Sequence, residues 1–132
     1  MGLSQGPGLS QGNAINVRPS AHLDLLHTQA SDTVTTTAFE EIFTYTATAD
    51  STRILQLECS ASTFGHYRIK VGATVVRERY TTGQEPTANF IFLEARTLAN
   101  GGIISVEFKA SRFIAGVASH TTFTSMEGYI GL

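Results

Sequence analysis

The sequence predicts an all-β fold, namely an antiparallel β-sandwich or jelly-roll-like domain of about 7–8 strands with an extended N-terminal arm. Three observations favour this fold. Short runs of alternating apolar and polar residues recur from residue 39 onward. Gly- and Pro-bearing turns separate these runs, and no helical apolar periodicity of useful length competes with them. With 132 residues, of which 42% are hydrophobic, the chain is long enough to bury one such core.

The composition divides the chain into three predicted segments. Residues 1–20 form the arm, residues 21–38 a lead-in segment, and residues 39–132 the β-sandwich domain. Within the lead-in, residues 22–29 are predicted to form one helical turn or an apolar lead-in that buries Leu23, Leu25 and Leu26. Residues 31–37 are polar and β-prone, which indicates an edge strand.

The arm contains a tandem six-residue repeat, GLSQGP followed by GLSQGN. Because six is a multiple of two, Leu3 and Leu9 share one face of an extended segment and lie about 20 Å apart. The glycines disfavour a helix. A flexible linker is one interpretation, and an arm that threads along a partner is the other. The second assigns partner binding to Leu3, Gln5, Leu9, Gln11, Ile15 and Val17.

The predicted strands of the domain are separated by short turns. They cover residues 39–48, 53–62, 66–71, 74–80, 88–96, 103–110 and 120–132. The predicted strands at 53–62 and 103–110 each show a one-sided apolar alternation that predicts their core-facing residues. In the strand at 53–62 these are Leu55, Leu57, Cys59 and Ala61. In the strand at 103–110 they are Ile104, Val106, Phe108 and Ala110. The sequence Asn100-Gly101-Gly102 predicts a hairpin turn between the strands at 88–96 and 103–110.

Charge and hydropathy exclude several partner classes. The net charge is −2 and 15% of residues are charged, so no basic field would attract nucleic acid or anionic lipid. No apolar run approaches the roughly 18 residues of a transmembrane helix. Residues 1–12 lack the basic and apolar regions of a signal peptide. We therefore expect no nucleic-acid partner, no membrane insertion and no Sec-type export.

No catalytic, cofactor or metal site is predicted. The four histidines are scattered, and one cysteine cannot complete a zinc-ligand set. Cys59 lies in an apolar alternation, which favours a buried spacer over a nucleophile. Glu94 and Glu107 lie on strands predicted to form a hairpin and could come close, but two glutamates alone favour a solvated sheet face over a glycosidase pair. Phosphate-loop, dinucleotide-binding and calcium-loop motifs are absent. The chain is predicted not to be an enzyme.

Residues 77–80 are a candidate interface. Arg77 and Arg79 project on one face of their predicted strand, and Tyr80 follows them. Seven of the nine basic residues are arginine, which favours fixed contacts at protein interfaces. An alternative is a sugar-binding platform of Tyr67, Tyr80 and Tyr129. The absence of tryptophan disfavours that platform relative to core or interface tyrosines.

The Gly-rich arm, the Thr-rich sandwich and the terminal strand FTSMEGYIG (residues 123–131) together resemble small structural proteins of tailed-bacteriophage virions. Such proteins include capsid decoration (cement) proteins and fibre or baseplate modules. The resemblance implies a homo-oligomer, a trimer or a dimer, whose arm binds the major capsid protein or other virion subunits. It also implies a location in the virion, after assembly in the host cytoplasm.

Two other functions stay open. One is a receptor- or glycan-binding module of a tail fibre or baseplate, with its activity in the loops at 81–87 and 111–119. The other is a small enzyme on a jelly-roll scaffold, which the missing metal-ligand spacing makes the least favoured.

Overall fold

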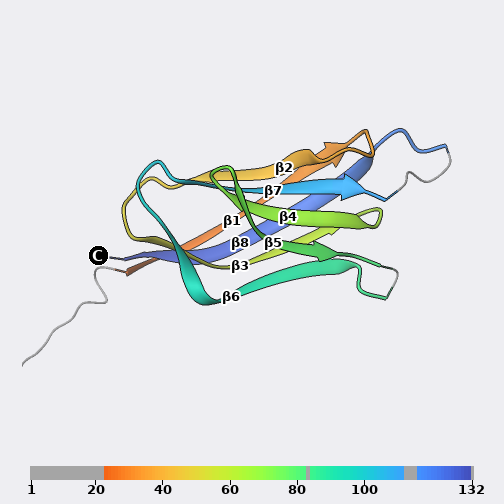
Figure 1. Ribbon diagram of the computed structural model, residues 1–132. Coiled ribbons are helices and arrows are strands. Elements are labelled where there is room, and N and C mark those ends of the chain that lie inside the picture. Colours follow the sequence, from red (N-terminus) through yellow and green to blue (C-terminus); the bar gives the residue numbers. More distant parts are fainter. Residues whose placement is uncertain (1–22, 83, 112–115, 132) are drawn as a thin grey trace, which may run out of the picture.

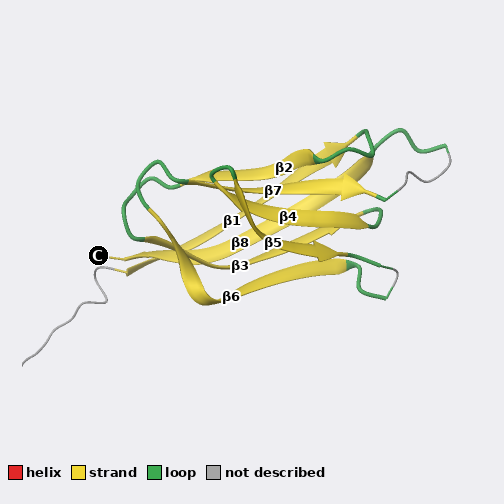
Figure 2. Cartoon of the chain, viewed as in Figure 1, coloured by secondary structure: helices red, strands yellow, loops and turns green. Residues whose placement is uncertain are grey.

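A computed structural model describes residues 23–82, 84–111 and 116–131 (Figure 1). These residues form eight β-strands and no helix (Figure 2). The strands are β1 (Leu23–Val34), β2 (Glu40–Thr46), β3 (Thr52–Ala61), β4 (Gly65–Val71), β5 (Thr74–Tyr80), β6 (Thr87–Leu98), β7 (Ile103–Ala110) and β8 (His120–Gly131). The described part of the chain accordingly holds no helix able to cross a membrane.

The strands form two four-stranded antiparallel sheets that pack against each other (Figure 1). The first sheet has the order β1-β8-β3-β6 and the second β2-β7-β4-β5. The pairings are nested, since β1 pairs with β8, β2 with β7, β3 with β6, and β4 with β5. A long antiparallel ribbon that wraps on itself in this way is a jelly-roll-like sandwich. The predicted all-β antiparallel sandwich of about 7–8 strands is confirmed, whereas the predicted arm lies outside the described residues.

The hydrophobic core lies between the two sheets. The predicted alternation in β7 is confirmed, since Ile104, Val106, Phe108 and Ala110 are all buried. Tyr67 of β4 packs its ring on Phe108, with 4.5 Å between the ring centroids. Burial of these side chains from both sheets provides most of the favourable free energy of folding.

A β-bulge in β3 changes which of its residues face the core. The register with β8 shifts between Ile54 and Gln56, so Leu55 is the extra residue. Ile54 and Leu57 are both fully buried, whereas Leu55 is 40% exposed. The prediction that Leu55 faces inward together with Leu57 is therefore wrong. A strict two-residue alternation cannot accommodate the inserted residue.

Gly128 of β8 makes this bulge possible. It pairs with Ile54, next to the inserted Leu55. A Cβ at position 128 would lie 2.0 Å from the carbonyl oxygen of Arg53 and 3.0 Å from its carbonyl carbon. Both atoms belong to the backbone of β3, so they cannot move aside as a flexible side chain would. Only glycine allows the two strands to approach so closely here.

The first described segment differs from its prediction. Residues 23–34 form β1, with twelve consecutive pairs to β8, so the helical turn predicted at residues 22–29 is wrong over residues 23–29. Leu25 is 89% exposed, contrary to its predicted burial, whereas Leu26 packs against the core. Successive side chains of a strand point to opposite faces, so the two leucines cannot both be buried. β1 is an edge strand of its sheet.

The predicted turn at residues 100–102 exists, but it does not close a hairpin. Gly101 has a φ of 86°, in the left-handed region that favours glycine. The strands on either side, β6 and β7, belong to different sheets. The turn is held by Ala47, whose carbonyl oxygen accepts from the Gly101 N–H at 2.8 Å and whose N–H donates to the Gly102 carbonyl oxygen at 2.8 Å. It therefore carries the chain across the sandwich.

Candidate interaction surfaces

The arm residues predicted to bind a partner lie outside the described part of the chain. They are Leu3, Gln5, Leu9, Gln11, Ile15 and Val17. The described chain begins at Leu23, which pairs with Gly131 near the C-terminal end (Figure 1). The surfaces next to the start of β1 are therefore the described surfaces nearest in sequence to the arm.

The β1 edge is the most regular of the four sheet edges. The other three edge strands, β2, β5 and β6, are each interrupted by a register shift. The largest shift is in β6, where the four residues Phe92–Ala95 lie opposite the single residue Leu55 of β3. β1 instead keeps one register over its whole length and contains no Lys, Arg, Pro or Gly. Natural edge strands are commonly protected against pairing with another chain by bulges, prolines or charged residues, especially lysine. β1 carries two aspartates, Asp24 and Asp32, but no bulge, proline or lysine, so its edge is only weakly protected against an added strand.

An apolar groove lies on the same sheet near the start of β1. We call it the β1 groove, and its volume is about 270 Å³. It is lined by Leu25, Leu26, His27, Leu55, Glu127 and Gly128. Glu127 supplies its polar rim, because one carboxylate oxygen accepts from Gln56 Nε2 at 2.6 Å and the other lies 3.5 Å from His27 Nδ1. Exposed leucines beside a fixed polar group are typical of a protein-binding surface.

A second hollow lies on the outer face of the other sheet. We call it the aromatic groove, of about 450 Å³, lined by Thr37, His66, Tyr80, Lys109, Ala110 and Ser111. The Tyr80 ring stacks on His66 with 4.2 Å between centroids and 19° between planes, and Phe39 meets His66 edge-on at 5.1 Å. Nε2 of His66 lies 2.7 Å from a carboxylate oxygen of Glu78. Tyr80 is 69% exposed, so it presents a positioned aromatic surface to solvent.

Glu107 organises the charges beside this groove. Its carboxylate lies 2.6 Å from Arg68 Nε and 3.4 Å from Lys70 Nζ, and the Arg68 guanidinium lies 3.7 Å from the centroid of the Phe39 ring. Partial burial acts to raise the pKa of Glu107. The hydrogen bond from Arg68 and the charges of Arg68 and Lys70 outweigh it, so the pKa is lowered from its ordinary value of 4.5.

Replacement of Glu107 with glutamine is expected to lower the free energy of unfolding by about 1 kcal/mol at neutral pH. Because the folded-state pKa is depressed, the contribution is complete above the unfolded value near 4.5 and is lost as pH falls through the folded pKa. Urea denaturation of the wild type and the variant at several pH values would measure this. The two proteins should converge in strongly acidic buffer, and a pH-independent difference would contradict the ionic origin.

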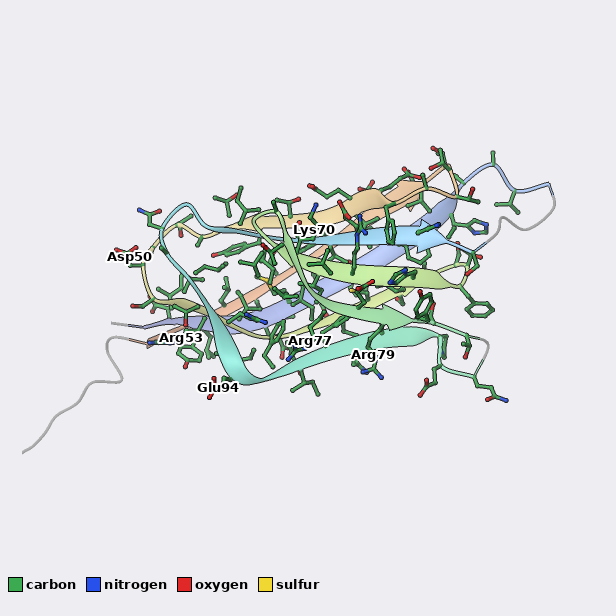
Figure 3. The ribbon with its side chains drawn as sticks, viewed as in Figure 1. Asp50, Arg53, Lys70, Arg77, Arg79 and Glu94 are labelled. Carbon is green, nitrogen blue, oxygen red and sulfur yellow. The ribbon has the colours of Figure 1, made fainter. Side chains whose placement is uncertain are left out.

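A third surface lies where β5 and β6 run side by side at the open edge of the sandwich (Figure 3). Arg77 and Arg79 pair with Ile69 and Tyr67 of β4, which places both arginines on the core-facing side of β5. Tyr80 pairs with His66 and faces the opposite way. The predicted shared face of Arg77 and Arg79 is confirmed, whereas their role in an interface stays a prediction.

The tyrosines do not form a single platform. Tyr67 is fully buried in the core, and Tyr80 lies in the aromatic groove. Tyr129 lies on β8 of the other sheet, with the guanidinium carbon of Arg53 5.7 Å from its ring centroid. The expectation of core tyrosines is correct for Tyr67.

The groups considered for chemistry do not assemble a reactive site. β6 and β7 belong to different sheets, so the predicted approach of Glu94 and Glu107 through a hairpin is wrong. Cys59 is fully buried, and burial raises the pKa of its thiol to about 12. Its prediction as a buried spacer is confirmed. Within residues 23–82, 84–111 and 116–131, no three His, Cys, Asp or Glu side chains cluster as metal ligands.

Two features of these surfaces escape sequence reasoning. The stack of Tyr80 on His66 depends on the register of the β4–β5 pair, which the Gly72 turn between them could have suggested. Leu25 is exposed because residues 23–34 form a strand, whose alternate side chains point to opposite faces. The alternation of polar residues after residue 26 could have indicated this strand.

Comparison with known proteins gives little further information. No protein-family model matches the chain, and no curated protein matches its sequence. Among solved structures, a similar chain occurs in the acidic stable capsid structure of Helicobacter pylori bacteriophage KHP30. It is 4% identical, the match covers 83% of this chain and 98% of that chain, and the TM-score is 0.48. A likeness this distant carries no argument about function, which must come from the residues themselves.

Proposed function

We propose that the protein is a virion structural protein of the capsid decoration (cement) type. In this role it binds neighbouring capsid subunits through its N-terminal arm and the adjoining edge of the sandwich. It acts as a homo-oligomer, without catalysis and without a cofactor. Many equivalent copies then reinforce a shell by avidity, even where each single contact is weak.

The observation that carries this proposal is the β1 edge. β1 keeps an uninterrupted register, contains no Lys, Arg or Pro, and follows directly on residues 1–22. Its outward-facing N–H and C=O groups have no strand partner among the described residues, because β1 ends its sheet. A capsid segment that adds to this edge would gain main-chain hydrogen bonds, and the β1 groove would receive its apolar side chains.

Co-sedimentation with capsids of the virus that encodes the chain tests this function. Deletion of residues 1–20 should abolish binding while leaving the circular-dichroism spectrum of a β-sandwich. Leu25→Ser should weaken binding about tenfold, because we place Leu25 among the few anchor residues of an interface that each contribute more than about 1 kcal/mol. Ile103→Ser is the matched control, since Ile103 is 43% exposed on the other sheet. Analytical ultracentrifugation would show whether the free protein is a trimer or a dimer.

Unchanged sedimentation of the deletion variant would contradict the role of the arm. Equal losses in the Leu25 and Ile103 variants would contradict the role of the β1 groove.

A second candidate function, glycan or receptor binding, is favoured by the aromatic groove. Its exposed Tyr80 ring is fixed by stacking on His66, and Thr37, Lys109 and Ser111 offer polar groups beside it. Ligand sites commonly combine an apolar surface with a few convergent polar groups. If this is the function, a glycan array should give signals that survive deletion of residues 1–20 and disappear in Tyr80→Ala. If no glycan on the array binds and the protein co-sediments with capsids, only the decoration function is supported.

A further inference from the structure

The edge between β5 and β6 gathers arginines from both sheets. The side chains of Arg77 and Arg79 project from the core-facing side of β5. Arg96 of β6 pairs with the buried Ile54 of β3, so its side chain also projects from the core-facing side of its strand. β5 and β6 are the outermost strands of their sheets, and no further strand covers the gap between them in the described structure (Figure 1). Arginines in such positions run their stems along the core and keep the charged head in water.

Two of these arginines meet over one ring. The guanidinium carbons of Arg77 and Arg96 lie 5.3 Å and 5.7 Å from the centroid of Phe92, which is 4% exposed. Both contacts are within the range of cation–π attraction. The ring thus fixes two guanidinium groups, one from each sheet, beside a cavity of about 340 Å³. That cavity is lined by Arg77, Glu94, Ala95 and Arg96.

The positive charge at this edge is not balanced within the described residues. In the ion pairs of the described residues, the positive partners are His27, His66, Arg68 and Lys70. None of these ion pairs includes an arginine of this edge. Glu78 lies between Arg77 and Arg79 in sequence but points to the other face, 2.7 Å from His66. Among the described residues that line the cavity, Glu94 is the single carboxylate. Figure 3 labels Glu94 and Arg77. Like charges held together in this way repel each other, and a bound anion would relieve the repulsion.

We propose that this arginine edge, formed by Arg77, Arg79 and Arg96, binds the carboxylates of an extended acidic segment of a partner protein. The planar guanidinium group bonds a carboxylate through two parallel N–H donors, and clusters of arginine recognise acidic motifs. An extended segment suits the site because both bordering strands are sheet edges. A nucleic acid suits it less, since the chain carries a net charge of −2 and Glu94 lines the cavity itself.

The test is fluorescence polarisation at low ionic strength with the full chain and a fluorescein-labelled Glu-Ser repeat peptide. The Arg77→Gln, Arg96→Gln double variant should bind this peptide about tenfold more weakly or worse, because it loses both guanidinium groups that would form charge-assisted hydrogen bonds with the peptide carboxylates. Arg53→Gln is the matched control. Arg53 also lacks a carboxylate partner among the described residues and lies over an aromatic ring, that of Tyr129. Its variant should bind like the wild type.

The Arg77→Lys, Arg96→Lys double variant retains both charges and the cover over Phe92. It should show an intermediate loss, because lysine cannot form the paired contact. Equal binding of a Gln-Ser repeat peptide, an equal loss in Arg53→Gln, or tighter binding of a single-stranded DNA oligonucleotide would each overturn the proposal. This surface lies apart from β1, so peptide binding and capsid co-sedimentation can fail separately.

Discussion

Replacement of Gly128 with alanine is expected to lower the free energy of unfolding by about 3 kcal/mol, at the upper end of the cost of forcing extra atoms into a packed site. The added Cβ would lie 2.0 Å from the Arg53 carbonyl oxygen, so β3 and β8 must separate or the bulge must close. Closing the bulge would shift the register by one residue and turn either Ile54 or Leu57 toward solvent. Chemical denaturation followed by circular dichroism would measure the loss.

Gly72→Ala provides the comparison for this variant. A Cβ at Gly72 meets no atom within 4 Å, but its φ of 62° is strained for alanine. We therefore expect a cost of about 1 kcal/mol at Gly72. An effect at Gly128 no larger than the one at Gly72 would show that the close approach of β3 and β8 is not essential.

Tyr67 is expected to respond in opposite directions to two substitutions. Its side chain is fully buried, and its hydroxyl has no hydrogen-bond partner among the described residues. Tyr67→Phe removes this unsatisfied group and should raise the free energy of unfolding by about 1 kcal/mol. Tyr67→Ala removes the ring that packs on Phe108 and should lower it by about 3–5 kcal/mol.

Thermal and urea denaturation of both Tyr67 variants would check these signs. Destabilisation by Tyr67→Phe would mean that the hydroxyl makes a favourable hydrogen bond in solution. A small effect of Tyr67→Ala would mean that the core between β4 and β7 repacks around the missing ring.

The strands of residues 39–132 could be predicted because apolar and polar side chains alternate locally. In β7 that alternation identified the core residues correctly. The bulge in β3 could not be predicted in the same way, because it depends on Gly128, far away in sequence. For that reason the two-residue alternation predicts the wrong face for Leu55.

The candidate surfaces depend even more on long-range contacts. Arg77 and Arg96 both contact the Phe92 ring because β5 and β6 are edge strands of two different sheets that lie next to each other. No local sequence pattern encodes the proximity of these two strands. The same property separates Glu94 from Glu107, which a hairpin would have brought together. Of the features of this surface, only the shared face of Arg77 and Arg79 could be predicted, because residues two apart in a strand point to the same side.

The nested pairing of the strands also sets an order for folding. The central pair, β4 with β5, closes over the two residues Gly72 and Ala73, whereas Leu23 of β1 must find Gly131 across almost the whole chain. The entropy lost on closing a loop increases with its length, and folds rich in such distant contacts form slowly. We expect the ribbon to zip outward from β4–β5 and to dock β1 last. The edge that we assign to capsid binding would thus become available only when the rest of the sandwich is complete, which would protect unfinished chains from premature assembly.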